Sequence, residues 1–393
     1  MSELSYLEKL LDGVEVEWVP VSELFQIKNG YTPSKSKKEF WENGTIPWFR
    51  LEDVRVNGRE LNDSIQHINP LGVKGFLFPK NSIFMSTTAT IGEYALVRVP
   101  YLTNQQITNF SISEKFSEAV NIKYIFYRFY DFGKWCTENA NKSGGVSIIG
   151  LKKLSQYQFP IPCPDNPEKS LAIQSEIVRI LDKFTALTAE LTAELTMRKK
   201  QYNYYRDQLL SFEQGEVEWK TLGEITTKIA SGRNKTRDSD GKFPVYGSTG
   251  LIGFIDKAAY SGDLLLVARV GAYAGLVNAV SGHFDVSDNT LIIHPSDSWN
   301  VRFAFHQLRH MNLNQYAVGA GQPLITGGLL KNLKVPFPSL KEQTRIAKIL
   351  DKFETITASI SEGLPREIEL RQKQYEYYRD LLFSFPKPDA VSN

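Results

Sequence analysis

Two loops of this 393-residue chain carry clustered positive charge with no acidic residue among the charges. The first, KNGYTPSKSKK, holds Lys28, Lys35, Lys37 and Lys38, and the second, KIASGRNKTR, holds Lys228, Arg233, Lys235 and Arg237. Basic side chains in loops rich in glycine, serine, threonine and asparagine can bind phosphate groups. A single such cluster is usually a solvated surface loop, but two at matching places make phosphate binding an equally good interpretation.

Motifs that would support catalysis are missing from the sequence. There is no Pro-Pro dipeptide, which excludes the Asn/Asp-Pro-Pro-Tyr/Phe motif that holds the target amine in adenine methyltransferases. No GxxxxGK[ST] phosphate loop occurs either. The five histidines show no metal-ligand spacing with the cysteines, and we expect His306 and His310, four residues apart, to be surface or capping residues. We therefore expect no catalytic residue and no metal site.

Both basic clusters follow the tetrapeptide EVEW at about the same distance, and EVEW is one of three repeated segments. EVEW occupies residues 15–18 and 216–219, ILDKF occupies 180–184 and 349–353, and RKKQYNYYRDQLLSF (198–212) returns as RQKQYEYYRDLLFSF (371–385). Eleven of the fifteen positions of the last pair are identical. The stretches between EVEW and ILDKF differ in length and show little resemblance. A shared frame with divergent middles suggests two sites that do related jobs on different targets.

The repeated segments have the 3–4 hydrophobic spacing of helices packed side by side. In the first copy this seam comprises Ile177, Ile180, Phe184, Leu187, Leu191 and Leu195; in the second it comprises Ile346, Ile349, Phe353, Ile356 and Ile360. The pattern predicts one helix over residues 168–212, roughly 68 Å long, with a stutter inside TAELTAEL (188–195). It predicts a second helix that is bent near Gly363 and Pro365. We expect the two helices to pair antiparallel.

The intervening stretches have the patterns of mixed α and β structure. Residues 82–99 and 263–280 are rich in β-branched and small residues and predict paired strands. Residues 121–133 and 300–311 predict amphipathic helices. Prolines in FPIPCPDNP (159–167) and VPFPSL (335–340) disfavour both a helix and a central strand, so these segments are expected to join the units to the long helices.

The composition is that of an ordinary water-soluble protein, with 42% hydrophobic and 23% charged residues. No apolar run approaches the roughly 18 residues of a membrane span, and the start, MSELSYLEKLLDG, lacks a signal-peptide pattern. Cys136 and Cys163 are expected to be inert thiols rather than a disulfide. These features predict a cytoplasmic protein. A net charge of +2 gives no global basic field.

The predicted fold class is α+β, with two tandem α/β units separated by two long helices that pair as an antiparallel coiled coil. YLEKLL (6–11) resembles YRDQLL (205–210), so the chain begins with the last turns of such a helix and the repeat is circular, with a pseudo-twofold axis. The expected division is a first unit over 1–158, a join and helix over 159–214, a second unit over 215–334, a join and helix over 335–386, and a flexible tail over 387–393.

This plan, together with PCPDNPEKSLAIQSEIVRILDKFTALTAELTAEL and REIELRQKQYEYYRDLLFSF, resembles the DNA-specificity subunit of type I restriction-modification enzymes, of the IC subfamily whose spacer contains TAEL repeats. The resemblance implies that each variable unit is a target-recognition domain reading one half of a split site in double-stranded DNA. It implies that the helices set the gap and dock two methylation subunits, and that restriction subunits join the full complex. S-adenosylmethionine (SAM), ATP and Mg are then expected on the partner subunits, with no cofactor on this chain.

Under this interpretation lysine and arginine anchor phosphates, while polar side chains read base edges in the major groove. Candidates in the first unit are Asn29, Thr32, Ser34, Lys35, Lys37, Lys38, Trp48, Arg50, Thr87, Thr88, Thr90, Asn104, Gln105 and Gln106. Candidates in the second unit are Ser231, Arg233, Asn234, Lys235, Arg237, Tyr246, Ser248, Thr249, Arg269, Tyr273 and Asn289. Trp48 and Tyr273 are equally good candidates for the hydrophobic core.

Two alternatives stand beside this interpretation. A non-catalytic adaptor, with two β-rich domains on a coiled-coil strut binding protein or glycan, explains the helices and the repeat but not the matched basic loops. A self-sufficient methyltransferase or nuclease requires motifs that the sequence lacks. The spacer hypothesis is quantitative, because a third TAEL would lengthen the helix by about 6 Å and should lengthen the gap between half-sites.

Overall fold

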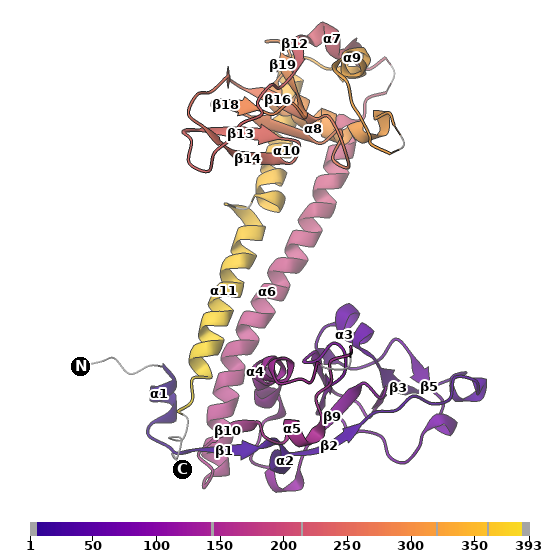
Figure 1. The fold of residues 1–393 in the computed structure, drawn as a ribbon, viewed down its shortest axis with the longest axis vertical. Coiled ribbons are helices and arrows are strands. Elements are labelled where there is room, and N and C mark those ends of the chain that lie inside the picture. Colours follow the sequence, from indigo (N-terminus) through magenta and orange to yellow (C-terminus); the bar gives the residue numbers. More distant parts are fainter. Residues whose placement is uncertain (1–5, 143–144, 214, 320, 360, 387–393) are drawn as a thin grey trace. The chain divides into compact units, whose positions relative to one another are not determined.

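The structure is a computed structural model that describes residues 6–142, 145–213, 215–319, 321–359 and 361–386. The chain forms two compact units: unit 1 comprises residues 1–187 and 371–393, and unit 2 comprises residues 188–370 (Figure 1). Each unit combines a variable stretch with parts of the long helices, so the helices do not form a unit of their own. The flexible tail expected at 387–393 and the seam residue Ile360 lie outside the described residues.

Unit 1 is built on two small sheets. The main sheet has the order β2 (Phe25–Asn29), β9 (Ile107–Ile112), β6 (Ser82–Ser86), β7 (Tyr94–Val97) and β4 (Glu60–Leu61). The second has the order β5 (His67–Ile68), β3 (Ile46–Phe49) and β8 (Leu102–Thr103). Its helices are α1 (Tyr6–Leu11), α2 (Val21–Leu24), α3 (Leu51–Asn57), α4 (Ile122–Glu138) and α5 (Leu151–Leu154). The predicted pairing within 82–99 is confirmed by the antiparallel β6 and β7.

Unit 2 repeats this plan. Its main sheet has the order β12 (Thr226–Ser231), β19 (Thr290–Pro295), β16 (Leu264–Ala268) and β17 (Val277–Val280), which matches β2-β9-β6-β7. The second sheet has the order β14 (Gly250–Ile255), β13 (Phe243–Gly247), β18 (His283–Val286) and β15 (Tyr260–Ser261). Its short helices are α7 (Leu222–Ile225), α8 (Val301–His310) and α9 (Gly327–Asn332). The common strand order shows that the two dissimilar stretches between EVEW and ILDKF share one α+β architecture.

The proline joins form strands, which the sequence did not predict. β10 (Gln158–Pro162) pairs antiparallel with β1 (Val16–Pro20), and β20 (Lys334–Phe337) pairs antiparallel with β11 (Glu218–Thr221). Each pair is a separate two-stranded sheet. Each strand therefore has an unpaired edge, where a proline costs no ladder hydrogen bond. The repeated EVEW segments recur because they supply the partner strands.

The first long helix, α6, runs from Pro167 to Leu210, close to the predicted range. The second is not one bent helix but two helices, α10 (Leu340–Ala358) and α11 (Gly363–Leu382). Gly363 has a φ of +78°, and a side chain there would collide with the carbonyl oxygens of Thr355 and Ile356. The chain thus turns too tightly at Gly363 for a continuous helix. Pro365 lies in the first turn of α11, where proline is tolerated.

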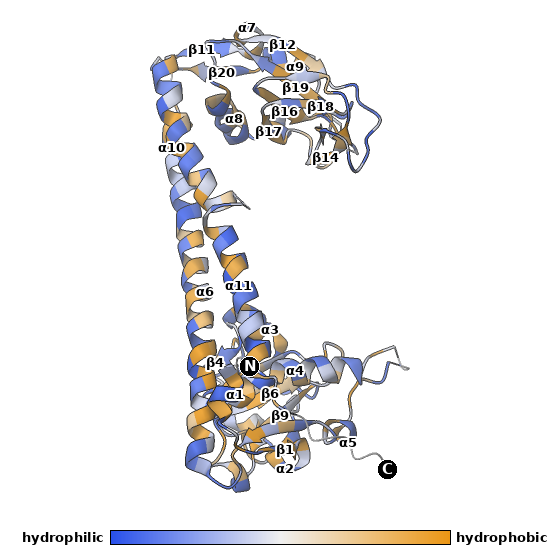
Figure 2. Cartoon of the chain, turned by 90° about the vertical axis from the view of Figure 1, so that its left-hand side faces the viewer, coloured by the Kyte–Doolittle hydropathy of each residue, from blue (hydrophilic) through white to orange (hydrophobic). Residues whose placement is uncertain are grey.

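Aromatic residues of the repeated segments stack on one another where the long helices pair. In unit 1 Phe184 of α6 stacks on Tyr378 of α11, with ring centroids 5.3 Å apart; in unit 2 Tyr205 of α6 stacks on Phe353 of α10 at 5.5 Å. A later residue of α6 meets an earlier residue of the returning helices, which is the antiparallel order. Hydrophobic and hydrophilic segments alternate along α6 and α11 (Figure 2).

The seam is less buried than the spacing suggests. Ile177 and Ile346 are buried, Phe184 and Phe353 are half-buried, and Ile356 exposes 38% of its surface. The most buried residues of the first half of α6 also include Val178 and Leu181, which join the core of unit 1. That part of the helix therefore packs against the core of unit 1 as well as against α11.

The aspartate of each ILDKF segment fixes the long helix to the unit's amphipathic helix. In unit 1 Asp182 accepts hydrogen bonds from Lys123 (2.9 Å) and Tyr127 (2.5 Å) of α4. In unit 2 Asp351 pairs with Arg302 (2.7 Å) and His306 (2.7 Å) of α8. The partners of the aspartate occupy equivalent positions of α4 and α8 in the two units. This shared contact explains why ILDKF is repeated.

His306 is fully buried, so the expectation of a surface or capping residue is wrong. Burial lowers the pKa of His306 although the neighbouring Asp351 opposes the shift. In the unfolded chain His306 takes up a proton near pH 6.5, whereas in the folded unit His306 takes up its proton only at a lower pH. The stability of the folded unit is accordingly complete above that pH and falls as the pH drops towards the lowered pKa of His306.

We expect unit 2 to lose thermal stability between pH 8 and pH 5.5, and His306→Tyr to reduce this loss. Tyrosine occupies the equivalent position in unit 1, Tyr127, and does not titrate in this range. A tenfold difference in proton affinity between the folded and unfolded chain corresponds to about 1.4 kcal/mol, or roughly 2–4 °C in melting temperature for a unit of this size. Calorimetry at both pH values checks this, with His306→Gln as a second neutral replacement. An unchanged pH dependence in both variants would contradict it.

Among the helices of the described residues, none combines the length and the apolar composition that a membrane span requires. Both cysteines are free, with Cys136 buried and Cys163 partly buried. Burial raises the pKa of the Cys136 thiol, which keeps it protonated and unreactive.

Candidate nucleic-acid interface

Each basic loop begins at a glycine that the fold requires. The backbone N–H of Gly30 donates to the carbonyl of Ile107, and that of Gly232 donates to the carbonyl of Thr290, both at 2.9 Å. A Cβ at Gly30 would lie well inside 3.0 Å of Thr103 and Asn104, and one at Gly232 would meet Val286 and Ser287 equally closely. The basic loop therefore crosses directly over the loop that precedes the second main-sheet strand, β9 or β19.

The next backbone contacts show that the loops of the two units are equivalent. Tyr31 donates to the carbonyl of Thr103, as Arg233 donates to that of Val286. The tip of the β6–β7 hairpin joins the same place, because Thr87 donates to the carbonyl of Gln106, as Arg269 does to that of Asn289. Three loops thus meet at the same end of each main sheet. The predicted matching of the two basic clusters has a structural basis in these contacts.

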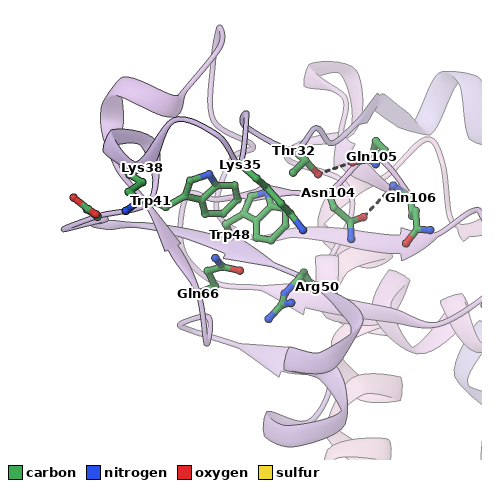
Figure 3. Close-up of a pocket in the computed structure, with 11 residues that line it drawn as sticks. Thr32, Lys35, Lys38, Trp41, Trp48, Arg50, Gln66, Asn104, Gln105 and Gln106 are labelled. Carbon is green, nitrogen blue, oxygen red and sulfur yellow. Dashed lines mark hydrogen bonds between the residues drawn. The ribbon is translucent and has the colours of Figure 1, made fainter.

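In unit 1 the basic loop and the loop 104–106 border an open cavity of about 670 Å³ (Figure 3). Its lining comprises Thr32, Lys35, Lys38, Trp41, Glu42, Trp48, Arg50, Gln66, Asn104, Gln105 and Gln106. Eight of these were candidates from the sequence. The cavity combines cations, side-chain amides and aromatic walls, which suits phosphates, base edges and base faces respectively.

The aromatic wall has fixed geometry. Trp41 and Trp48 meet edge to face with centroids 5.1 Å apart. Their indole N–H groups donate to the carbonyls of Ser34 and Tyr31, both at 3.1 Å, so the rings offer apolar surface rather than donors. Trp48 is only 4% exposed and belongs to the core beneath the cavity. The Arg50 guanidinium lies over the Trp48 ring, 5.8 Å from its centroid.

The amide wall is preorganised by short hydrogen bonds. Thr32 donates to the Gln105 side-chain oxygen at 2.5 Å, and the Asn104 side-chain oxygen accepts from the Gln106 backbone N–H at 3.0 Å (Figure 3). The first bond holds the loop 104–106 against the basic loop, and the second fixes the conformation within 104–106. The remaining amide groups of Asn104 and Gln105 can pair with a ligand. Asparagine and glutamine are the side chains that most often read adenine.

Several unit 1 candidates lie outside the cavity. Thr87 is buried and hydrogen-bonded to Thr108, which in turn donates to Asn29, so these side chains tie the loops together. Thr90 is exposed on the β6–β7 hairpin, and Thr88 is half-buried there. Ser34 and Lys37 are exposed on the basic loop without lining the cavity.

In unit 2 the candidates differ in exposure. Arg233, Lys235, Arg237, Thr249 and Asn289 are exposed, while Ser231, Asn234, Tyr246, Ser248 and Arg269 are half-buried. Ser248 donates to the carbonyl of Asn289 at 3.0 Å, and Asn234 donates to Asp285 at 2.7 Å. Tyr273 is 58% exposed and lines a separate cavity of about 330 Å³ with Asn312 and Asn314. It is therefore not a core residue.

Trp41, Glu42 and Gln66 line the cavity but were not predicted. Trp41 follows the basic cluster by three residues, and an aromatic residue beside basic ones was an available signal. Gln66 reaches the site only through tertiary structure, because its carbonyl accepts from the Trp48 backbone N–H at 3.0 Å. No local pattern announces such a residue.

One group of possible metal-ligating atoms occurs among the described residues, formed by His306, Asp351 and Glu354. Arg302 lies 2.7 Å from Asp351 and 2.6 Å from Glu354, and Arg309 lies 2.8 Å from Glu354. Two guanidinium groups already balance the carboxylates, so this cluster is better suited to joining α8 and α10 than to holding a cation.

Comparison with known proteins identifies the family. The profile described as "Type I restriction modification DNA specificity domain" matches residues 13–197 and 215–370. The chain is 51% identical over 378 residues to the type I restriction enzyme EcoprrI specificity subunit of Escherichia coli, covering 92% of this chain and 93% of that one. It is 38% identical to the EcoR124I/EcoR124II specificity subunit of Escherichia coli, with both chains fully covered.

Solved structures share the fold. The crystal structure of the type I restriction-modification S subunit from M. genitalium matches with a TM-score of 0.62 at 17% identity, covering 96% of this chain and 98% of that chain. A structure described as concerning complex assembly and conformational transition of the type I R-M system matches with a TM-score of 0.56 at 16% identity, covering 94% and 97%. The family match favours a DNA-specificity role over the adaptor alternative. The chain belongs to the type I restriction-modification DNA specificity family and is the specificity subunit of such an enzyme.

Proposed function

We propose that each unit reads one half of a split site in double-stranded DNA through the three loops that meet at the end of its main sheet. In unit 1 Lys35 and Lys38 contact phosphates, while Asn104 and Gln105 read base edges in the major groove. In unit 2 Arg233 and Lys235 of the basic loop contact phosphates, and Asn289, the equivalent of Gln106, reads a base edge. The half-buried ring of Trp41 then packs against the deoxyribose or base surface at the edge of the recognised sequence, and Trp48 supports that ring from the core.

The observation that carries this proposal is the equivalence of the two loop sets. Gly30 and Gly232, Tyr31 and Arg233, and Thr87 and Arg269 make the same backbone hydrogen bonds, yet the side chains around them differ. Two domains that recognise different DNA sequences need the same loop backbone with different polar side chains on it. A structural role alone would not need a basic loop at both positions.

The long helices complete the proposal. Their antiparallel pairing sets the gap between the two half-sites, with the TAEL segment as its adjustable part, and they carry two copies of the methylation subunit in the cytoplasm. Those subunits bring SAM and methylate adenine, and restriction subunits with ATP and Mg join them for cleavage. The residues of this chain bind, orient and select the DNA.

Replacing Lys35 and Lys38 together by alanine tests the phosphate role. Binding of the complex to its own duplex should weaken, and to unrelated duplexes in the same proportion, because phosphate contacts carry no sequence information. The slope of log affinity against log salt should fall by about 1.8, or roughly 0.9 for each lost contact. Titrations across salt concentrations measure this. Lys9→Ala with Lys169→Ala, both exposed on helices, is the matched control; an equal slope in both double variants would exclude the phosphate role.

A further inference from the structure

Unit 1 exposes an aromatic side chain that belongs neither to its core nor to the lining of its cavity. Phe76 is 90% exposed, although phenylalanine is among the residue types most often buried. It lies in the segment 70–80, PLGVKGFLFPK, between β5 and β6. Leu71 of the same segment is 70% exposed. Two large, mostly exposed apolar side chains within one short segment indicate a binding surface.

The backbone is fixed on both sides of Phe76. On one side the backbone N–H of Lys74 donates to the hydroxyl oxygen of Tyr31. On the other side Phe78 is buried and exchanges two backbone hydrogen bonds with Tyr101, at 2.8 and 3.1 Å. Phe76 lies two residues from each of these anchors, so little backbone freedom remains to be lost when its ring binds a ligand.

The segment 70–80 is held against the basic loop of unit 1. Tyr31, near the start of that loop, donates its hydroxyl to the carbonyl of Gly72 at 3.4 Å. Phe40 follows the last lysine of the loop, and its carbonyl accepts from the backbone N–H of Asn69 at 2.9 Å. Phe76 is therefore presented beside the loop for which phosphate binding is proposed.

The charge of the segment 70–80 fits a polyanion. Lys74 and Lys80 flank Phe76, both are exposed, and the segment contains no acidic residue. An apolar ring between two cations suits DNA, which offers stacked bases with phosphates on both sides. A protein partner would have to place acidic side chains opposite both lysines as well as apolar surface opposite the ring. DNA meets these requirements without any special arrangement.

Unit 2 has a small side chain at the equivalent position. The antiparallel backbone pairing of Tyr260 matches that of Phe78. The residue two positions earlier is Phe76 in unit 1 and Ala258 in unit 2, where the neighbouring Asp256 is acidic. The shared fold therefore does not require an exposed ring at this place. A side chain present in one unit alone suits a contact that serves one of two different half-sites.

We propose that Phe76 is a wedge that enters the duplex between two adjacent base pairs at the edge of the sequence read by unit 1, while Lys74 and Lys80 contact the phosphates on either side. This inference rests on the proposed function. Apolar side chains that enter between base pairs from the minor groove partly unstack them, so the affinity depends on how easily that base step deforms. The first half-site then carries a preference for a flexible pyrimidine–purine step at this place, and the second half-site carries none from Ala258.

The test is the fluorescence of 2-aminopurine, a base analogue that brightens when it is unstacked, placed at one purine position at a time along both half-sites. The protein is the complex of the full chain with its methylation subunit. Phe76→Ala should abolish the increase at the edge of the first half-site and weaken duplex binding roughly 10-fold. Phe76→Trp keeps a ring and should retain both. Val56→Ala removes another exposed apolar side chain of unit 1 and should change neither.

The possible outcomes are distinguishable. Replacing an almost fully exposed side chain should leave the melting temperature unchanged. A signal lost in Phe76→Ala, with no change along the second half-site, supports the proposal. Fluorescence that does not depend on Phe76 overturns it, and so does a variant that binds the duplex normally but the methylation subunit more weakly, because the ring then contacts protein. Failure of the proposed function shows separately, as the absence of a split methylation motif for the unaltered complex.

Discussion

Gly30→Ala should make the enzyme indifferent to the sequence of one half-site, and Gly232→Ala should do the same for the other half-site. At both positions the new Cβ would collide with backbone atoms of the loop underneath, which have no side-chain freedom with which to yield. The basic loop must then shift away from Asn104 or from Ser287. Overpacking of this kind costs about 3 kcal/mol, which corresponds to roughly a 100-fold loss of specific affinity.

Competition binding with duplexes altered in one half-site at a time measures this effect. Gly150→Ala in unit 1 and Gly328→Ala in unit 2 are the matched controls, because a Cβ at Gly150 meets nothing within 4 Å and one at Gly328 only touches Thr326 at 4.0 Å. Both controls should keep full discrimination. The account of the loops is wrong if Gly30→Ala weakens discrimination at both half-sites equally, or at neither.

Inserting a third TAEL after Leu195 should increase the gap between the two half-sites and leave both half-sites unchanged. Four added helical residues lengthen α6 by about 6 Å, and one base pair advances the duplex by about 3.4 Å, so the gap should grow by one or two base pairs. The added residues also turn the helix by roughly 40° beyond a full turn, which the rotation of the longer DNA segment partly offsets. The original site should become a poor substrate.

Methylation mapping of the insertion variant checks this result. Thr192→Ala is the control of constant length; Thr192 is exposed and its hydroxyl only donates back to the Thr188 carbonyl at 2.7 Å. That variant should keep the original gap. An unchanged gap in the insertion variant would show that the helices do not set the spacing.

Elements with internal periodicity were predictable from the sequence. The 3–4 hydrophobic spacing around Ile177 and Ile346 predicted both helical regions, and the repetition of EVEW and ILDKF predicted the two-unit plan. The structure adds the reasons: EVEW pairs with the proline joins, and the ILDKF aspartates hold α4 and α8. Periodicity did not predict the separation of α10 from α11, because it depends on the close approach of Gly363 to the carbonyl of Thr355.

The candidate site was predicted in part. The basic clusters and the amide run 104–106 are local in sequence, and the structure brings the first cluster and this run together around one cavity. Gln66 was missed because only the pairing of β3 with β5 places it there. The burial of His306 was not predicted because its side-chain partner, Asp351, lies 45 residues away in the sequence. Which side chains contact bases remains a prediction, since recognition depends on loop geometry and on DNA deformability as well as on residue type.

The most direct test of the central claim is to co-express the chain with its cognate methylation subunit and to map N6-methyladenine at base resolution on host DNA. The two units have equivalent loop backbones but different polar side chains on those loops. The account therefore predicts one split motif, in which two short defined sequences flank a gap of fixed length and unspecified sequence. A single continuous motif, or no motif despite a stable complex, would contradict the account.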